Sequence, residues 1–362
     1  MLYLFSFILI LSLVVIVHEG GHFFVARLCG IQVEAFSIGF GKKLWSHKDK
    51  KGTEWKICAV PLGGYVQMLG DEDAASSKKS KKVLTPEEEK RTFFAQPVYK
   101  RAAVIFAGPF MNYVLAIVIF TAILATMGYP RIPAKVGQVL DGSVAQSAGI
   151  QVGDLILAVN EKKIEDFTDL KRAIVLGSYG QTINLKIERN GQILNLSVKP
   201  ELVGKDEVPQ LGVVSEAVVE PSFKRYNPIT AFGKAVEEVY QMNVDTFVYL
   251  KQIIMGKRKA NDLRGPVGIA EASGDAAKGG WLSFILFLAQ VSVGIGFVNL
   301  LPVPILDGGH LVFLAYEAVV RKPISERVQN ALLKVGMALL LFLFCFTLFK
   351  DIPRVIGRVF GL

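Results

Sequence analysis

Apolar residues gather in four long blocks, and the chain between these blocks reads as ordinary soluble protein. A helix needs about 20 apolar residues to cross a bilayer. The first block continues through a short polar motif, and the third is too long for one span and contains prolines and paired glycines. The pattern predicts four transmembrane helices, the third of them broken, from blocks at residues 2–17, 102–127, 281–320 and 331–349.

Basic residues flank the blocks unevenly, which predicts how the chain crosses the membrane. Residues 27–101 hold 15 Lys and Arg against 9 Asp and Glu, and such basic loops stay in the cytoplasm. Residues 128–280 are then expected outside, and so is the C-terminal tail, although its own basic residues oppose this. The first block has no basic residues before it and no small-x-small site after it, so we interpret it as a retained helix rather than a signal peptide.

The segment between the second and third blocks predicts a small α+β domain. Asn190-Gly191 is a strong hairpin signal, and Asp166 or Thr168 is expected to begin a helix. The run S-x-A-x-x-A-G-I-x-x-G-D-x-I-x-x-V-N, which begins at Ser143, resembles a PDZ domain of the kind attached to bacterial proteases. Alternation typical of strands recurs at residues 135–140, 155–160, 183–188 and 193–198.

A PDZ-like domain binds an extended peptide by adding it to a sheet edge, and we expect Val136 and Val139 to lie on that edge. The alternative is a steric filter that binds no peptide tightly. Further along, Asn227-Pro228 predicts the start of a helix that ends near Gly256. The apolar face of this helix either lies on the outer membrane surface or packs on the spans.

Composition excludes several classes of protein. The chain has 362 residues, 51% of them hydrophobic and only 20% charged, with a mean hydropathy of +0.40. A soluble cytosolic enzyme, a disordered protein and a single-anchor protein are therefore excluded. The net charge of +9 could indicate a nucleic-acid binder, but the basic residues cluster beside the apolar blocks, so we expect no nucleic-acid partner. Three widely spaced cysteines form no disulfide framework.

His18-Glu19-Gly20-Gly21-His22 is an H-E-x-x-H sequence at the end of the first block. Residues i and i+4 share one face of a helix, so both imidazoles can hold one zinc ion. Glu19 can reach a zinc-bound water as general base. Ionisable groups within an apolar span are costly unless they are paired or bound to a metal, which favours a functional site over a solvated helix end.

A catalytic zinc site needs a third protein ligand, and the broken third block offers two. Asp307 is an acid beside a helix break, and broken backbone at membrane depth occurs only where it is buried in protein or lines a cavity. Two histidines and a carboxylate would leave the fourth position for water. The residues favour Asp307, but His310 is equally close in sequence and remains a rival ligand.

An ordered set of motifs resembles the site-2 protease family, the bacterial intramembrane zinc metalloproteases of peptidase family M50. The set spans nearly the whole chain and comprises H-E-G-G-H-F, F-S-I-G-F-G, P-L-G-G-Y-V-Q-M-L-G, G-P-F-M-N, the PDZ-like segment, G-P-V-G-I and N-x-x-P-x-P-x-L-D-G-G-H. The best-known members carry two PDZ domains, whereas this chain has room for one. Its Gly-Gly within the zinc motif also replaces the common Phe-Gly.

The resemblance implies a role for each motif. His18, His22 and Asp307 would bind one Zn²⁺, and Glu19 would be the general base. Asn299 would hold the substrate backbone or the oxyanion. Alternatively, Asn299 could donate hydrogen bonds to backbone carbonyls that Pro302 and Pro304 leave without a partner. Residues 53–70 would form a re-entrant β-hairpin whose edge pairs with extended substrate, the alternative being an ordinary cytoplasmic hairpin. The substrate contacts are then expected at Gly63, Gly64, Tyr65 and Asn112, although Asn112 could instead support helix packing.

The sequence thus predicts a polytopic α-helical membrane protein with four transmembrane helices, a membrane-associated β-hairpin and an inserted α+β PDZ-like domain. We expect it in a bacterial inner membrane, with its active site near the cytoplasmic side and the PDZ-like domain outside. Its partners would be the bilayer, single-span protein substrates such as anti-sigma factors or signal-peptide remnants, and a peptide ligand of the PDZ-like domain. The alternatives are a PDZ-bearing membrane adaptor with an inactive zinc site and, less favoured, a transporter with a broken helix. The expected divisions are 1–28, 29–101, 102–128, 130–202, 203–280, 281–320, 331–350 and 351–362.

Overall fold

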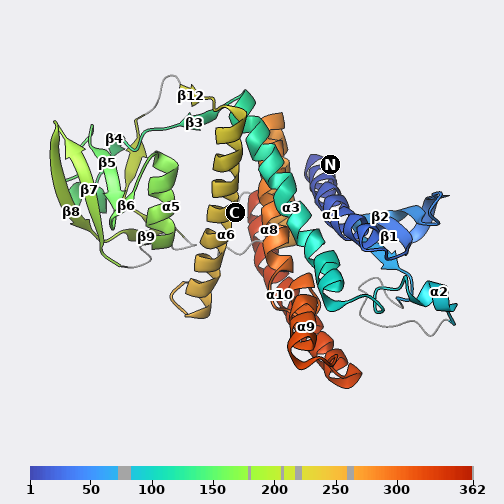
Figure 1. The fold of residues 1–362 in the computed structure, drawn as a ribbon. Coiled ribbons are helices and arrows are strands. Elements are labelled where there is room, and N and C mark those ends of the chain that lie inside the picture. The colour runs from blue at the N-terminus through green and yellow to red at the C-terminus, as the bar shows by residue number, and fades with distance from the viewer. Residues whose placement is uncertain (72–82, 178–180, 205–207, 217–221, 259–264, 361–362) are drawn as a thin grey trace. The chain divides into compact units, whose positions relative to one another are not determined.

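The apolar blocks form four helices, each long and apolar enough to cross a membrane (Figure 1). These are α1 (Leu2–Leu28), α3 (Val98–Thr126), α8 (Trp281–Asn299) and α10 (Glu326–Phe360). The structure is a computed structural model that describes residues 1–71, 83–177, 181–204, 208–216, 222–258 and 265–360. It divides into one unit of residues 1–120 with 264–362 and a second unit of residues 121–263.

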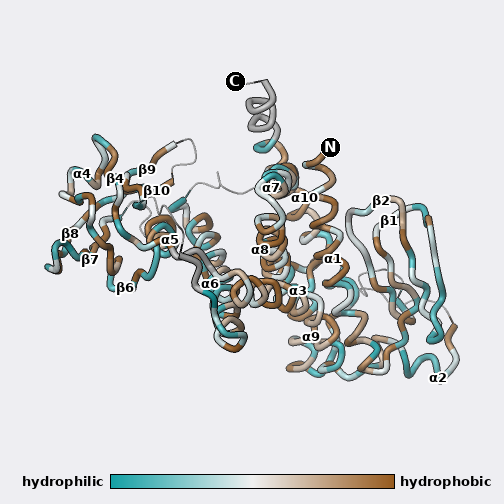
Figure 2. Tube along the Cα trace, turned by 90° about the horizontal axis from the view of Figure 1, so that it is seen from above, coloured by the Kyte–Doolittle hydropathy of each residue, from teal (hydrophilic) through white to brown (hydrophobic). Residues whose placement is uncertain are grey.

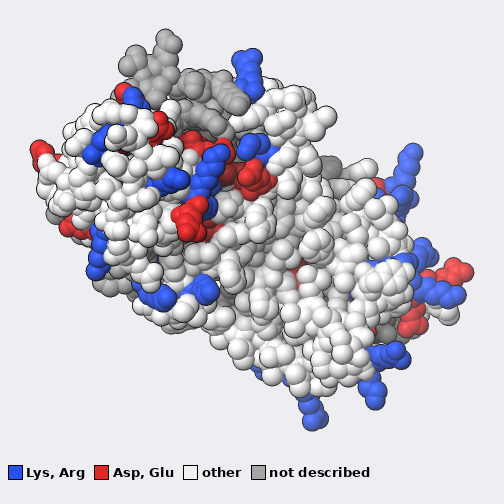
Figure 3. Space-filling view, turned by 60° about the vertical axis from the view of Figure 1, so that its left-hand side comes forward, with Lys and Arg blue, Asp and Glu red and all other residues white. Residues whose placement is uncertain are grey.

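The helices of the first unit carry apolar side chains over most of their length, as the brown stretches of α1, α3 and α8 show in Figure 2. Within the unit, Ile10 and Val14 of α1 are buried against Leu288 of α8. Figure 3 shows a broad area that is almost free of charged side chains, with Lys, Arg, Asp and Glu gathered toward its margins. A broad area with few charged side chains is typical of a protein that faces lipid.

The third block is broken, as its prolines predict. Helix α8 ends at Asn299, a turn containing Pro302 and Pro304 follows, and α9 (Asp307–Val320) begins beyond it. The fourth block lies in α10, which continues to Phe360, so the predicted tail from residue 351 is mostly helical. The short helices α2 (Pro86–Glu89) and α7 (Pro266–Lys278) complete the helices described in this unit.

The predicted hairpin is present as the antiparallel pair β1 (Val33–Lys48) and β2 (Glu54–Met68). One half of it packs under the helices, where Phe36, Val66 and Met68 are buried with Val104 of α3. The other half exposes large apolar side chains, including Trp45 at 53% exposure. The hairpin therefore has one half fixed on the helical unit and one half with an apolar surface.

The second unit is an α+β domain in which the predicted strands and helices form. Its main sheet has the order β6-β5-β7-β8, and the turn between β7 and β8 places Asn190 and Gly191 at positive φ, as the hairpin signal requires. Asp166 Oδ1 accepts the Asp169 N–H at 2.9 Å, so Asp166 rather than Thr168 caps α5. The strands of this sheet are β5 (Leu155–Val159), β6 (Lys162–Lys163), β7 (Ile183–Arg189) and β8 (Gln192–Val198). The domain also contains the helices α4 (Val144–Ser147) and α5 (Phe167–Gly177).

Strand β4 (Val136–Val139) is not the open edge that the sequence predicts. One side of it pairs with β11 (Val213–Ser215), with Val139 opposite Val213. On its other side, the Val136 N–H donates to the Asp154 carbonyl at 2.8 Å, and Val136 is only 1% exposed. The prediction that Val136 and Val139 present an open edge to a peptide is therefore wrong. Its cause is a partner strand more than 70 residues away, which local alternation cannot reveal.

The core of this domain also extends past residue 202, where the sequence placed its end. Leu211 is buried in the same cluster as Ile156 and Ile187, and Val213 packs against that cluster. Four short strands, β3 (Tyr129–Arg131), β9 (Glu201–Val203), β10 (Val208–Gln210) and β12 (Ser222–Lys224), form two further pairs. The expected division at 202 thus falls inside the packed domain.

Helix α6 (Pro228–Ile254) begins as predicted, because Asn227 Oδ1 accepts the Thr230 N–H at 2.9 Å and Pro228 occupies the first turn. One face of α6 is held to α5 by ion pairs from Arg172 to Glu238 and Asp245. The opposite face carries a row of exposed apolar side chains that includes Ile229, Phe232, Val236, Tyr240, Phe247 and Ile254.

Candidate metal centre and active site

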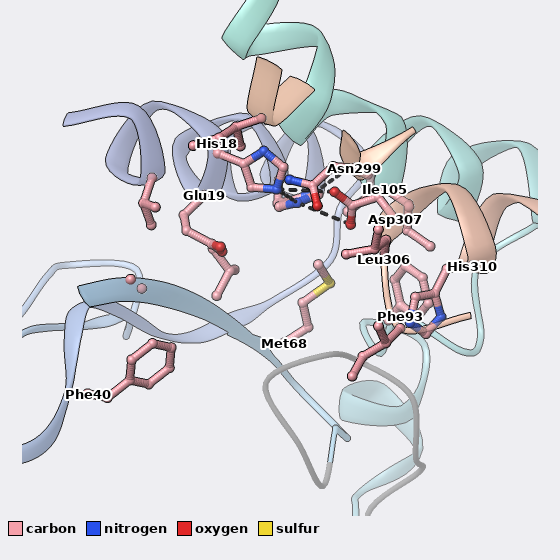
Figure 4. Close-up of a pocket in the computed structure, with 18 residues that line it drawn as sticks. His18, Glu19, Phe40, Met68, Phe93, Ile105, Asn299, Leu306, Asp307 and His310 are labelled. Carbon is pink, nitrogen blue, oxygen red and sulfur yellow. Dashed lines mark hydrogen bonds and ion pairs between the residues drawn. The ribbon is translucent and has the colours of Figure 1, made fainter. Parts of the chain in front are cut away.

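His18, His22 and Asp307 converge in the first unit, from two helices far apart in the sequence (Figure 4). His18 Nε2 lies 3.2 Å from His22 Nε2 and 3.1 Å from Asp307 Oδ2, and His22 Nε2 lies 3.6 Å from Asp307 Oδ1. Within the described chain, these three residues are the group of His, Cys, Asp and Glu side chains that could hold a metal ion.

The geometry of this cluster fits zinc. Ligands about 2.0–2.1 Å from a tetrahedral zinc lie ~3.3–3.4 Å from one another, and the observed separations of 3.1–3.6 Å bracket this value. Asp307 Oδ2 is buried and has no hydrogen bond within the described chain, despite its approach to His18. A buried carboxylate oxygen of this kind needs a cation. The three residues could thus hold a zinc ion, and they would leave its fourth position for water.

Local sequence explains how each ligand reaches the cluster. His18 continues a buried stripe of α1 at four-residue spacing, after Ile10 and Val14. Asp307 is the first residue of α9, where the positive end of the helix dipole favours a negative charge. The break at Pro302 and Pro304 starts a new helix at this depth, which brings the carboxylate to the imidazoles.

Glycines allow α1 and α3 to approach closely around the imidazoles. A Cβ on Gly108 of α3 would lie 2.3 Å from His22 Nε2 and 2.9 Å from His18 Cε1. A Cβ on Gly21 would lie 2.3 Å from the Ala107 carbonyl oxygen, whereas a Cβ on Gly20 would meet nothing within 4 Å. Of the two glycines in the H-E-G-G-H motif, Gly21 is therefore the one that helix packing requires.

Helix α3 also contacts Nδ1 of both imidazoles, the ring nitrogen that faces away from the cluster. His22 Nδ1 lies 2.8 Å from the Val104 carbonyl oxygen, and His18 Nδ1 lies 3.2 Å from the Asn112 side-chain amide. Asn112 is fully buried and does not line the cavity beside the metal cluster. The sequence suggests that Asn112 contacts the substrate, but in the structure its amide faces His18 and not the cavity.

Glu19 lies beside the cluster and lines a cavity of about 310 Å³. Its side chain packs against β2, where a Cβ on Gly64 would lie 3.4 Å from Glu19 Cγ. The hairpin therefore positions the acid of the H-E-x-x-H motif. The cavity is otherwise mainly apolar; its further lining includes Val15, Phe40, Met68, Phe93, Ile105, Ile295, Ile305 and Leu306.

The other expected site residues lie around this cavity. Asn299, at the C-terminal end of α8, lines it together with Gly63 and Gly64 of β2. Tyr65 follows in β2 but does not line the cavity; its ring stacks on Phe40 with the centroids 6.1 Å apart. His310 also lines the cavity, but it lies one turn beyond Asp307 and outside the cluster, as Figure 4 shows. The geometry thus favours Asp307 over His310 as the third ligand.

Sequence reasoning missed the contacts that α3 makes to the histidines. The signal was present, because Val104, Gly108 and Asn112 recur at four-residue spacing and so share one face of a helix. Nothing in the motif, however, indicates which helix that face meets.

Comparisons with known proteins agree with this site. The sequence profile of peptidase family M50 matches residues 6–343. A protein of Mesorhizobium japonicum, named as a zinc metalloprotease, is 41% identical over 360 residues, covering 96% of this chain and 98% of its own. Metalloprotease MmpA of Caulobacter vibrioides is 37% identical over 382 residues, covering 97% of this chain and 95% of its own. A PDZ domain of an SdrC-like protein from Listeria innocua matches 25% of this chain and 99% of its own, with 18% identity and a TM-score of 0.22.

The apolar helices and the three-ligand cluster define a multi-pass membrane metalloprotease that uses zinc. The chain belongs to peptidase family M50.

Proposed function

We propose that the chain is an intramembrane endopeptidase that cuts single-span membrane proteins by hydrolysis at the His18–His22–Asp307 cluster. The observation that carries the proposal is the position of this cluster: its histidines lie on α1, which is apolar enough to span a bilayer, and its aspartate begins α9, just after α8, which is also apolar enough to span one. Single-span proteins, including anti-sigma factors and signal-peptide remnants, are the substrate class that such a site can receive from the lipid. A soluble substrate would have no need of a site within apolar helices.

The chemistry divides among the residues around the cavity. The two histidines and Asp307 would hold a zinc ion, which when bound would activate a water and polarise the scissile carbonyl. Glu19 accepts a proton from the attacking water and returns it to the leaving amine. The contact of its side chain with Gly64 of β2 keeps its carboxylate beside the cavity. Asn299 donates its amide N–H to the oxygen on which negative charge develops, which it can do without adding charge to an apolar site.

The hairpin receives the substrate in extended form. Helical peptide bonds are shielded by their own hydrogen bonds, so a membrane-spanning substrate has to unwind before attack. Gly63 and Gly64 line the cavity in β2, and an unwound segment lies along this strand by main-chain pairing. The two glycines let the hairpin itself pack closely at this point, because a Cβ on Gly63 would lie 2.4 Å from the Phe40 ring and a Cβ on Gly64 would lie 2.7 Å from the Ser37 carbonyl oxygen.

We further propose that the active site lies near the cytoplasmic side of a bacterial inner membrane and that the small domain is a PDZ-like module on the outer side. The basic loop of residues 27–101 supports this orientation. A peptide ligand would pair with β11 rather than with β4, because among the described strands β11 pairs with β4 alone and Val214 is exposed.

The test is Glu19→Gln in the full chain, reconstituted in lipid with candidate single-span substrates. Loss of the general base is expected to reduce cleavage about 10²–10⁴-fold while the zinc content stays at that of the wild type. Glu87→Gln on the exposed helix α2 is the matched control and is expected to cleave normally. Comparative membrane proteomics of cells carrying Glu19→Gln should then reveal the uncleaved substrates. Cleavage by Glu19→Gln at the wild-type rate would refute the proposal.

A further inference from the structure

Asn112 is placed where it can control the metal ligand His18. It is fully buried in α3, and its side-chain nitrogen lies 3.2 Å from His18 Nδ1, whereas its oxygen is buried without a hydrogen bond in the described chain. Asn112 belongs to the G-P-F-M-N motif, to which the proposed chemistry assigns no role.

The chemistry of a metal-binding imidazole decides which amide atom faces it. His18 directs Nε2 at His22 and Asp307, so a metal there takes the Nε2 lone pair and the ring proton resides on Nδ1. Nδ1–H is a donor, and its partner must be an acceptor. The oxygen and nitrogen of an amide have nearly the same shape, and the hydrogen-bond network decides their orientation. With the amide turned so that its oxygen faces His18, this buried acceptor would gain the partner it lacks.

The surroundings hold Asn112 in this position. Ser292 of α8 donates its hydroxyl to the Asn112 backbone carbonyl at 2.9 Å. A Cβ on Gly296, one turn further along α8, would lie 3.4 Å from the Asn112 Cβ, so the two helices are in close contact here. Because these contacts hold the Asn112 amide in place, a hydrogen bond to it restricts rotation of the His18 imidazole.

The same face of α3 serves both histidines. Val104, Gly108 and Asn112 are four residues apart, so they form one stripe on the helix. The Val104 carbonyl accepts from His22 Nδ1, Gly108 leaves room for both rings, and Asn112 contacts His18. His22 is thus oriented by a backbone atom, whereas the partner of His18 is a side chain and can be changed by mutation.

We propose that Asn112 is a positioning residue of the zinc site, whose side-chain oxygen accepts the Nδ1–H of His18 and holds Nε2 toward the metal. Partners of this kind raise the basicity of a ligating histidine and fix its tautomer. The inference rests on the proposed assignment of His18 as a zinc ligand, and it replaces the substrate contact that the sequence suggested for Asn112.

The experiment measures zinc affinity in the purified full chain by competition with a chromophoric chelator. Asn112→Leu removes the acceptor and keeps most of the volume, and it is expected to weaken zinc binding about 10–100-fold. Asn112→Asp keeps an acceptor opposite Nδ1–H, so its affinity is expected to stay within about threefold of the wild type. Ser292→Ala removes a buried hydrogen bond in the same helix contact without touching His18, and it should bind zinc as the wild type does.

A second readout separates positioning from mere packing. The visible absorption spectrum of the Co²⁺-loaded protein reports ligand geometry and should change in Asn112→Leu but not in Ser292→Ala. Equal zinc affinity in Asn112→Leu and the wild type would overturn the inference, as would equal weakening by Asn112→Leu and Asn112→Asp. A wild-type protein that binds no zinc would overturn the proposed function itself, so the two failures are distinguishable.

Discussion

Asp154 of the second unit and Asp307 of the first each have a carboxylate withdrawn from solvent, fully in Asp154 and at Oδ2 in Asp307, and their partners differ. In the small domain, Asp154 receives Arg189 Nε and Nη2 at 2.7 Å each and the Gln151 N–H at 2.9 Å. In the membrane unit, Asp307 faces two imidazole nitrogens, and its Oδ2 has no hydrogen bond within the described chain. The first carboxylate is neutralised by an arginine of its own domain, whereas the second has only the two histidines as ion-pair partners within the described chain. A carboxylate withdrawn from solvent therefore suggests a metal site where the protein supplies no permanent positive charge beside it.

The same substitution at both aspartates tests whether Asp307, but not Asp154, is needed for zinc binding. Asp307→Asn removes the charged ligand and should lower zinc affinity more than about 100-fold, because changes in outer contacts alone cost 10–100-fold. Cleavage should fall below detection. After a chelator has removed the metal from both proteins, the variant should unfold at the same temperature as the wild type or at a higher one. The reason is that it no longer carries the Asp307 charge, which is largely withdrawn from solvent.

Asp154→Asn is the matched control, and its zinc content and cleavage should equal those of the wild type. Measurement of both quantities on the two variants decides the comparison. Retention of zinc by Asp307→Asn would contradict the view that the Asp307 carboxylate serves a metal.

Gly20 and Gly21, which are adjacent in the zinc motif, test how closely α1 packs against α3 in the first unit. Gly21→Ala places a Cβ 2.3 Å from the Ala107 carbonyl oxygen and should destabilise that unit by about 1–3 kcal/mol. Gly20→Ala meets nothing within 4 Å and should be neutral or stabilising by up to about 1 kcal/mol, because alanine favours helix. Thermal unfolding in detergent measures both. Equal effects at the two positions would show that the contact between α1 and α3 is not tight.

The smallest expected effect concerns pH and the small domain. Burial alone would raise the pKa of the Asp154 carboxyl, but the hydrogen bonds from Arg189 and Gln151 outweigh it and hold this pKa below its usual value. A depressed pKa contributes stability that is complete above the unfolded value of about 3.9 and is lost as the pH falls through the folded value.

Asp154→Asn should therefore speed amide exchange in β7 about tenfold at pH 7, since one charge-assisted interaction is lost. The difference from the wild type should shrink as the pH falls below about 3.9. Hydrogen–deuterium exchange, with both proteins compared at each pH, measures this. A difference that grows toward acid would show that another group, and not Asp154, carries the effect.

Much of this fold follows from local pattern. The four apolar blocks, the break at Pro302 and Pro304 and the hairpin at Asn190-Gly191 each depend on residues close in sequence, and each is present in the structure. The pairing of β4 was mispredicted because its partner β11 comes more than 70 residues later. Local alternation indicates that a strand forms, but it carries no information about which strand will lie beside it.

The site divides in the same way. The spacing of His18 and His22 by itself determined that both imidazoles share one helix face with Glu19 beside them, because a helix brings residues i and i+4 together. Only the tertiary structure shows that Asp307, and not His310, lies with the two imidazoles, and only it brings Asn112 to Nδ1 of His18. Those choices depend on how separate helices pack, and packing is set by side chains and glycines on distant segments. The sequence thus determined the chemistry that is available, and the fold decided which residues take part in it.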